Sequence, residues 1–264
     1  MKVLSLFSGI GGLDLAAEWA GMETVAFCEI EPYPVEVLKR RWPDVPVYND
    51  VRELTRERLE RDGILPIDII TGGFPCQDVS YAGKRVGFHD QDGEVTRSGL
   101  WAEYARLIGE IRPRWVVAEN VRGLLSIPAA GIVGGGFGIV LRDLADLGYR
   151  AGWCCYGACD VGGFHRRERV FVVAHSGGGR PYIVGTREQN RFSFFSLEDG
   201  KKWASTQGVL SLNSIFLGTK PNRGILRNND GFPEGLDRMK ALGNAVVPQQ
   251  AYPIFRAIME VEAK

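Results

Sequence analysis

Short apolar runs alternate with helical patterns along most of this 264-residue chain, and this alternation limits its fold more than any other feature. The first two runs are Val3 to Phe7 and Thr24 to Cys28, and residues 12–20 and 34–41 have apolar positions at helical spacing. The pattern continues through residues 46–48, 53–60, 67–71, 100–111, 115–118, 139–147, 153–156 and 170–174. Strands that alternate with helices favour an α/β fold with a doubly wound, mostly parallel sheet.

The same periodicity divides the chain into three predicted parts. Residues 1–174 form the α/β domain, and residues 175–237, where Gly, Ser, Asn and Arg interleave with aromatic residues, form a small irregular lobe. In residues 238–264 a helical pattern from about Pro248 to Val261 has an apolar stripe, so we expect this segment to return to the first domain. The glycine-rich residues 131–138 lack the Gly-Lys-Ser/Thr ending of a phosphate-binding loop, and we expect a mobile loop there.

Charge is distributed unevenly along the chain. The net charge is +0, which by itself argues against a nucleic-acid partner. Residues 161–240, however, contain thirteen Lys and Arg against seven Asp and Glu, and the rest of the chain carries the opposite excess. This asymmetry favours one basic face on an acidic body, although a solvated loop region would give the same charge pattern.

Cysteine usage and apolar runs indicate the cellular setting. No run of eighteen or more apolar residues is present, and the N-terminus lacks the pattern of a secretory leader, so we expect a cytoplasmic protein without membrane contact. The five cysteines have no framework spacing, which favours reduced thiols. Cys154, Cys155, Cys159 and His165 invite a zinc-site interpretation, but their spacing fits no standard paired-cysteine site, and we predict no metal.

A glycine turn and two acids follow the first three apolar runs. The turn is Phe7-Ser8-Gly9-Ile10-Gly11-Gly12, and it would let the carboxylate or phosphate of a ligand approach the N-terminus of the next helix. Glu29 ends the second run and Asp50 ends the third, where they could accept hydrogen bonds from ribose hydroxyls and an adenine amino group. Each acid could instead be a helix N-cap, but their joint placement favours an adenosyl ligand.

The fourth run delivers a cysteine to the edge of the sheet where ligands bind. Residues 67–71 lead into Gly72-Gly73-Phe74-Pro75-Cys76-Gln77-Asp78-Val79-Ser80. A lone cysteine is usually a small buried apolar residue, but this position suits a reactive thiol.

Five segments together resemble the ordered motif series of the cytosine-5 DNA methyltransferases of bacteria and phages. They are Phe7 to Asp14, Gly72 to Ser80, Glu119-Asn120-Val121, Arg167-x-Arg169 and Gly243-Asn244-Ala245-Val246-Val247-Pro248. Each segment is short, but five in the right order over nearly the whole chain make a specific match. The resemblance implies the Rossmann-like fold of S-adenosylmethionine-dependent methyltransferases, with residues 175–237 as a target-recognition lobe.

The resemblance also implies a reaction, which is methyl transfer from S-adenosylmethionine to C5 of cytosine in a specific double-stranded DNA sequence. Cys76 would add to C6 of a base flipped out of the duplex, because C5 becomes nucleophilic only after that addition. In the family's mechanism Glu119 contacts N3, Arg169 contacts O2 with Arg167 nearby, and Asn120 orients the glutamate and the cysteine loop.

Further residues are implied as contacts to DNA and to the cofactor. Gln77 and Ser80 resemble contacts to the DNA backbone or to the gap left by the flipped base. His165 stands where the family usually has glutamine, and it could still donate one hydrogen bond, tune the pH dependence or only fill space. The implied S-adenosylmethionine contacts are Phe7, Gly9, Ile10, Gly11, Gly12, Glu29, Ile30, Asp50, Val51, Pro75, Leu100, Asn244 and Val246.

Three other functions remain open at this point. A methyltransferase acting on RNA would use the same motifs, and the His165 departure and the short lobe are compatible with an inactive DNA-binding homologue. An NAD-dependent dehydrogenase would share the glycine turn but gives no reason for Pro-Cys-Gln or Glu-Asn-Val. We find no endonuclease motif, so a restriction partner would be a separate chain, and a monomer suffices for one base at a time.

Overall fold

The structure is a computed structural model that describes residues 1–75, 100–126, 135–163, 165–177 and 243–263. Cys76, Gln77 and Ser80 lie outside the described residues, as does most of the lobe predicted at residues 175–237. The roles of these residues and the division into three parts therefore stay predictions.

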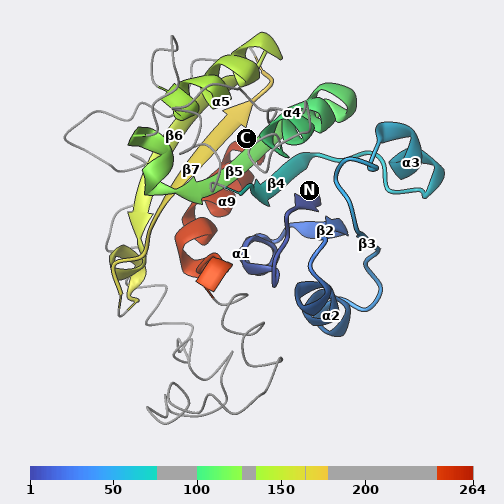
Figure 1. Cartoon of the computed structure of the whole chain (residues 1–264), viewed down its shortest axis with the longest axis horizontal. Coiled ribbons are helices and arrows are strands. Elements are labelled where there is room, and N and C mark those ends of the chain that lie inside the picture. Colours follow the sequence, from blue (N-terminus) through green and yellow to red (C-terminus); the bar gives the residue numbers. More distant parts are fainter. Residues whose placement is uncertain (76–99, 127–134, 164, 178–242, 264) are drawn as a thin grey trace, which may run out of the picture.

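Within the described residues, seven strands form one mixed sheet in the order β3-β2-β1-β4-β5-β7-β6 (Figure 1). The strands are β1 Lys2–Leu6, β2 Glu23–Cys28, β3 Val47–Tyr48, β4 Ile69–Gly73, β5 Trp115–Val121, β6 Arg150–Gly157 and β7 Glu168–His175. Strands β1 to β5 are parallel to one another, whereas β7 runs antiparallel to both β5 and β6. The predicted α/β fold with a doubly wound, mostly parallel sheet is confirmed.

Helices cover both faces of this sheet. They are α1 Gly12–Trp19, α2 Pro32–Arg41, α3 Arg56–Arg61, α4 Leu100–Ile111, α5 Gly135–Asp146 and α9 Pro248–Glu262, with short 3-10 helices η3 Arg122–Ser126 and η4 Ala158–Val161. Successive residues of β5 point to opposite faces, so Val116 packs with α3, α4 and α5 while Val117 packs with α1 and α9. The C-terminal helix α9 thus lies beside α1, near the middle of the sheet (Figure 1).

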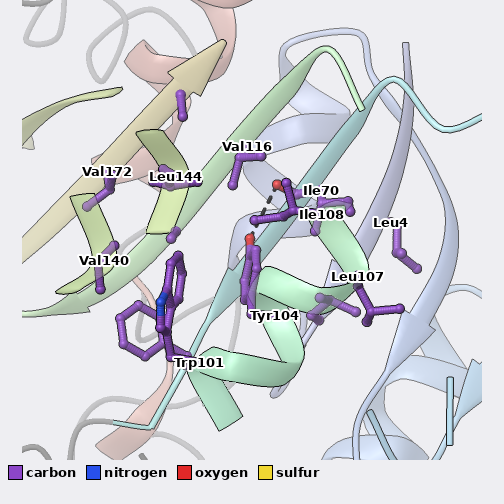
Figure 2. Packing of buried hydrophobic residues seen from close by; sticks show 14 of the residues in the cluster. Leu4, Ile70, Trp101, Tyr104, Leu107, Ile108, Val116, Val140, Leu144 and Val172 are labelled. Carbon is purple, nitrogen blue, oxygen red and sulfur yellow. Dashed lines mark hydrogen bonds between the residues drawn. The ribbon is translucent and has the colours of Figure 1, made fainter. Parts of the chain in front are cut away.

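Tyr104 of α4 fixes that helix across the central strands. Figure 2 shows its ring pointing into the sheet next to Trp101, Ile70 and Ile108. The buried hydroxyl donates to the carbonyls of Ile70 at 3.3 Å and Val117 at 3.2 Å. A buried phenol needs such acceptors, and these two carbonyls belong to β4 and β5. The contact therefore holds α4 over the strands that lead to the candidate site.

The prediction of a mobile loop at residues 131–138 is wrong for its second half. Residues 135–138 form the first turn of α5, and residues 131–134 lie outside the described residues. Phe137 is buried and its ring packs edge-on against Trp153 of β6, with centroids 5.0 Å apart. Burial of this aromatic ring offsets the poor helix propensity of the neighbouring glycines.

The helix predicted at residues 53–60 begins later, at Arg56, because Thr55 caps it. The Thr55 hydroxyl accepts a hydrogen bond from the backbone N–H of Arg58 at 3.2 Å. In the part of the chain that the structure describes, no helix is long and apolar enough to cross a membrane.

Asp14, in the first turn of α1, is a buried carboxyl that joins that helix to two strands. It accepts hydrogen bonds from the Ser5 hydroxyl of β1 at 3.0 Å and the Thr24 hydroxyl of β2 at 3.2 Å. Burial raises the pKa of Asp14 to about 6, and the two hydroxyls oppose that rise only in part. The folded protein therefore holds a proton on Asp14 that the unfolded chain has already lost at pH 5.

We expect Asp14→Asn to change the pH dependence of stability. A carboxyl whose pKa is raised by folding stabilises the fold below its unfolded pKa and loses that contribution as pH rises through about 6. The free energy of unfolding of the variant, relative to the parent, should therefore increase by about 2 kcal/mol between pH 4.5 and 7. Urea unfolding at several pH values measures this, and a constant difference would contradict it.

Candidate active site

The candidate site lies where the strand order reverses. From β1 the chain continues outward to β2 and β3, and then crosses back to β4 and β5 on the other side of β1. Sheets of this kind bind their ligands at the carboxyl ends of the strands beside such a reversal. The glycine turn follows β1, the segment leading to Cys76 follows β4, and Glu119-Asn120 lies at the end of β5.

The glycine turn is held by Glu29. Phe7, Gly9 and Gly11 have positive φ values of 50°, 53° and 81°, and α1 begins directly after them. One oxygen of the Glu29 carboxylate accepts from the N–H of Gly9 at 2.7 Å, and the other accepts from the N–H of Glu31 at 2.9 Å. Burial raises the pKa of Glu29, while these N–H groups favour its ionised form. The backbone N–H of Ile30 also bonds this carboxylate, and a ribose hydroxyl could use the lone pair that remains.

Asp50 and Ile30 lie near this turn, beyond the ends of β3 and β2. Asp50 accepts two-pronged hydrogen bonds from the Arg52 guanidinium, the shortest at 2.6 Å, and these hold its pKa below the usual range. Ile30 is 61% exposed, whereas Val51 is buried. The helix-cap alternative for the two acids is wrong, because the N-caps of α2 and α3 are Glu31 and Thr55.

The C-terminal segment with Asn244 and Val246 packs on the glycine turn. A Cβ atom added to Gly12 would lie 2.4 Å from the backbone carbonyl oxygen of Val246. Residues more than two hundred positions apart thus share one surface, as expected if both belong to one cofactor site. Pro75 and Leu100, also predicted for that site, are partly buried at the end of the β4 segment and the start of α4.

We expect Gly12→Ala to separate the C-terminal segment from the glycine turn. The contact is with a backbone atom, so the segment must move as a unit, and overpacking of this kind costs about 1–3 kcal/mol. Affinity for S-adenosylmethionine should fall by at least roughly tenfold, which calorimetric titration measures. Gly21→Ala is the matched control for stability, because a Cβ atom at Gly21 meets nothing within 4 Å, although Gly21 has a positive φ of 85°.

Glu119 and the two arginines meet across the antiparallel pair β5 and β7. Val121 is the register partner of Arg169, so the Glu119 side chain lies diagonally across from Arg169 on the same face. The Arg169 Nε atom is 2.7 Å from a Glu119 carboxylate oxygen, and both side chains are almost fully buried. Burial raises the pKa of Glu119 to about 7, and the charges of Arg169 and Arg167 limit the rise.

Arg167 has spare hydrogen-bonding capacity. Its Nε and Nη2 atoms are buried, and among the described residues neither has a hydrogen-bond partner. Burial and the neighbouring Arg169 lower the pKa of Arg167 from its usual value, whereas Glu119 raises it. A buried guanidinium without a partner is costly, so this group is suited to an acceptor such as a base carbonyl or a phosphate.

Asn120 joins β5 to the chain segment that leads to Cys76. Its side-chain amide donates to the carbonyl of Phe74 at 2.9 Å, and its side-chain oxygen accepts from the N–H of Val121 at 2.8 Å. Phe74 packs on Trp101 at 5.0 Å between ring centroids. This arrangement fits the positioning role predicted for Asn120, although Cys76 itself lies outside the described residues.

The family of the chain follows from a comparison with known proteins. The model of the C-5 cytosine-specific DNA methylases matches residues 1–211, a range that includes the glycine turn, Cys76, Glu119 and both arginines. The chain belongs to this family.

Curated relatives of this chain are considerably longer. The Type II methyltransferase M2.BsuMI of Bacillus subtilis is 37% identical over 179 residues, which are 66% of this chain and 42% of that protein. The Type II methyltransferase M.FnuDI of Fusobacterium nucleatum is 34% identical over 208 residues, covering 75% of this chain and 56% of that protein. The chain thus spans about half the length of these relatives.

Solved structures share the fold. A crystal structure from E. coli, described as a DNA modification methyltransferase encoded within a prophage, has a TM-score of 0.53 at 28% identity and covers 66% of this chain and 46% of that chain. A Spodoptera frugiperda DNMT2 mutant has a TM-score of 0.54 at 20% identity, covering 71% of this chain and 53% of that chain. The second likeness concerns the fold alone.

His165, where this chain departs from the family's usual glutamine, precedes β7. The side chain is exposed, and its Nδ1 atom accepts from the backbone N–H of Arg167 at 3.4 Å, which is a long hydrogen bond. Its contact with DNA stays a prediction.

The cysteines considered for zinc lie on β6 and η4, whereas His165 precedes β7. Cys154 and Cys155 are consecutive in β6 and so point to opposite faces of the sheet, and Cys159 is exposed. Within the described ranges, no three His, Cys, Asp or Glu side chains gather as a metal site.

Two residues at the site were missed by sequence reasoning. Gly73 lies beside Glu119, where a Cβ atom would come within 2.7 Å of the carboxylate. Gln250 is fully buried in the first turn of α9 and contacts the arginine segment. The sequence signal that could have identified Gln250 is a polar residue in the first turn of a helix that is expected to pack on the core.

Proposed function

We propose that this chain transfers a methyl group from S-adenosylmethionine to C5 of cytosine in double-stranded DNA, with Cys76 as a covalent nucleophile. One observation carries the proposal. It is the buried carboxyl of Glu119, whose pKa is raised to about 7, beside β4 and the segment that Asn120 holds two residues before Cys76. A group with this pKa can donate a proton at neutral pH, which an ordinary exposed glutamate does poorly.

The proposed reaction starts with attack on C6. The thiolate of Cys76 forms a bond with C6, the C5–C6 π electrons pass into the ring toward N3, and Glu119 donates its proton or a hydrogen bond there. C5 of the resulting enamine would then supply the electron pair for the new bond to the methyl group, while the methyl–sulfur bond of the donor breaks and S-adenosylhomocysteine leaves. Loss of the C5 proton returns electrons to the ring and expels the thiolate, and the sequence names no residue for that last proton transfer.

The two arginines suit the edge of the base that carries the O2 carbonyl, next to N3. Arg169 is already paired with Glu119 and would orient both the carboxyl and the O2 carbonyl of cytosine. Arg167, with two unpartnered guanidinium nitrogens among the described residues, would meet the base carbonyl or a neighbouring phosphate. Because neither thiol nor methyl donor could reach the ring inside a duplex, base flipping is part of the proposal.

The residues of the glycine turn fit S-adenosylmethionine, which supplies the methyl group when bound. The first-turn N–H groups of α1 suit its carboxylate, and the remaining lone pair of Glu29 suits a ribose hydroxyl. Ile30 is an exposed apolar side chain next to Glu29, which a purine ring would cover. The packing of Val246 on Gly12 supports a contribution of the C-terminal segment to the same site.

Expression in a bacterial host that lacks cytosine methylation tests this proposal. Bisulfite sequencing of the host DNA should find protected cytosines in one sequence context with the chain, and none with the empty vector. Sequencing of bisulfite-treated host RNA runs in parallel. If protected cytosines appear only in RNA, the substrate is RNA and not DNA. If they appear in neither while the protein is folded and binds S-adenosylmethionine, the result favours an inactive DNA-binding homologue. A separate endonuclease, a cytoplasmic location and a monomeric state stay predictions.

A further inference from the structure

The side-chain amide of Gln250 joins two strands near the arginine pair. Gln250 lies in the first turn of α9 and has no exposed surface. Its Nε2 atom donates to the carbonyl of Tyr156 at 2.6 Å and to the carbonyl of Arg167 at 2.9 Å. One side chain thus bonds the backbone of β6 with one N–H and the backbone of the arginine segment with the other.

These two carbonyls lie where the β6–β7 hairpin reaches the candidate site. Tyr156 is the register partner of Arg169, and the Arg167 carbonyl also accepts from the N–H of Ala158 at 3.0 Å. The bonds from Gln250 therefore fix the position of the backbone of residues 167–169 relative to α9. A shift of this backbone would move the Arg169 guanidinium away from Glu119, which lies on the neighbouring strand.

The same end of α9 also contacts the glycine turn. Val246 and Val247 directly precede the helix, and the Val246 carbonyl lies against Gly12. Only three residues of chain therefore separate the contact with the predicted cofactor site from the contact with the arginine segment. The side-chain oxygen of Gln250 has no hydrogen-bond partner among the described residues, so the contribution of this residue comes from its donors.

We propose that Gln250 is a positioning residue for methyl transfer, holding the Arg167–Arg169 backbone in register with Glu119 and with the segment that packs on the glycine turn. This inference rests on the function proposed above. It predicts that loss of the two donors lowers the rate of methyl transfer and weakens the use of DNA as substrate, while the affinity for S-adenosylmethionine stays nearly unchanged.

Gln250→Leu removes both donors at similar volume. Because misplacement of catalytic groups by about 1 Å can cost 10²-fold, we expect kcat to fall at least about tenfold and the KM for unmethylated host DNA to rise several-fold. The dissociation constant for S-adenosylmethionine should stay within about twofold. Amide hydrogen exchange in residues 156–169 should become faster, and this readout does not depend on activity.

Glu262→Gln is the matched control, because it loosens the other end of α9. Glu262 accepts from the Trp115 indole at 2.8 Å and pairs with Arg114, far along the helix from Gln250. This variant should lose stability without changing the exchange of residues 156–169 or the KM for DNA. Gln250→Glu is a second test, because its protonated carboxyl regains one donor and activity should recover toward the parent as pH falls.

The outcomes separate the two proposals. If the parent chain methylates nothing, the proposed function fails, and faster exchange at residues 156–169 in Gln250→Leu alone still supports the positioning contact. If the parent is active and Gln250→Leu matches Glu262→Gln in exchange, kcat and the KM for DNA, the inference about Gln250 is wrong.

Discussion

Cys76→Ser should abolish methyl transfer. A serine hydroxyl is hardly ionised at neutral pH and adds to C6 far more slowly than a thiolate, so we expect kcat to fall by at least roughly 10⁴-fold. Single-turnover transfer of a labelled methyl group to unmethylated host DNA measures the rate. A duplex with 5-fluorocytosine at the target gives a second readout, because C5 then has no proton to lose and the parent should remain covalently attached.

The other cysteines provide the controls for this prediction. Burial raises the pKa of Cys28 to about 12 and that of Cys154 well above its usual value, so neither thiol can replace Cys76 at neutral pH. Cys159 is exposed, and Cys159→Ser should leave both the rate and the covalent complex unchanged. If the Cys76→Ser protein keeps more than a tenth of the parental rate, the covalent mechanism through Cys76 is wrong.

Glu119→Gln should lower kcat by roughly 10²- to 10⁴-fold, because the amide can donate a hydrogen bond to N3 but cannot transfer a proton. The pH dependence gives the sharper test. Since the acid form is required and its pKa is about 7, the Glu119 contribution is present below pH 7 and is lost as pH rises through that value. The parental kcat/KM for DNA, which reports groups of the free enzyme, should therefore fall on the alkaline side, and the variant should lack that fall.

Glu168→Gln is the neighbouring control. Glu168 lies next to Arg169 in sequence but pairs with Arg122 at the surface, at 2.7 Å. Exposed pairs of this kind contribute little, so the rate and its pH profile should match the parent. An identical alkaline fall in the parent and in Glu119→Gln would show that another group titrates, and the assignment of Glu119 as the acid would be wrong.

The order of strands and helices was predictable because local patterns set it. The runs that became β1, β2 and β4 and the helical spacing of α1 and α4 were all read within about two residues of their bounds. The exception at residues 135–138 has a clear reason. Four residues rich in glycine look like a loop locally, but the burial of Phe137 against Trp153 makes them helical.

Apart from Gly73 and Gln250, the candidate residues of the described region were also named from the sequence, but the contacts between them were not. Nothing local indicates that β7 inserts antiparallel between β5 and β6, and this pairing is what brings Arg169 to Glu119. The capping alternative for Glu29 and Asp50 was decided by where α2 and α3 begin, since their N-caps are Glu31 and Thr55. Glu29 instead accepts from the N–H of Gly9, 20 positions away, which no local pattern indicates.

The sequence by itself determined the fold class, the element order and the types and order of the reactive residues, since periodicity and short motifs are properties of neighbouring positions. Only the tertiary structure decided three further features. These are the raised pKa of Glu119, the contact of Val246 with Gly12 and the bonds from Gln250 to the arginine segment. Each depends on burial or on contact between residues far apart in the chain, and packing of the whole domain sets both.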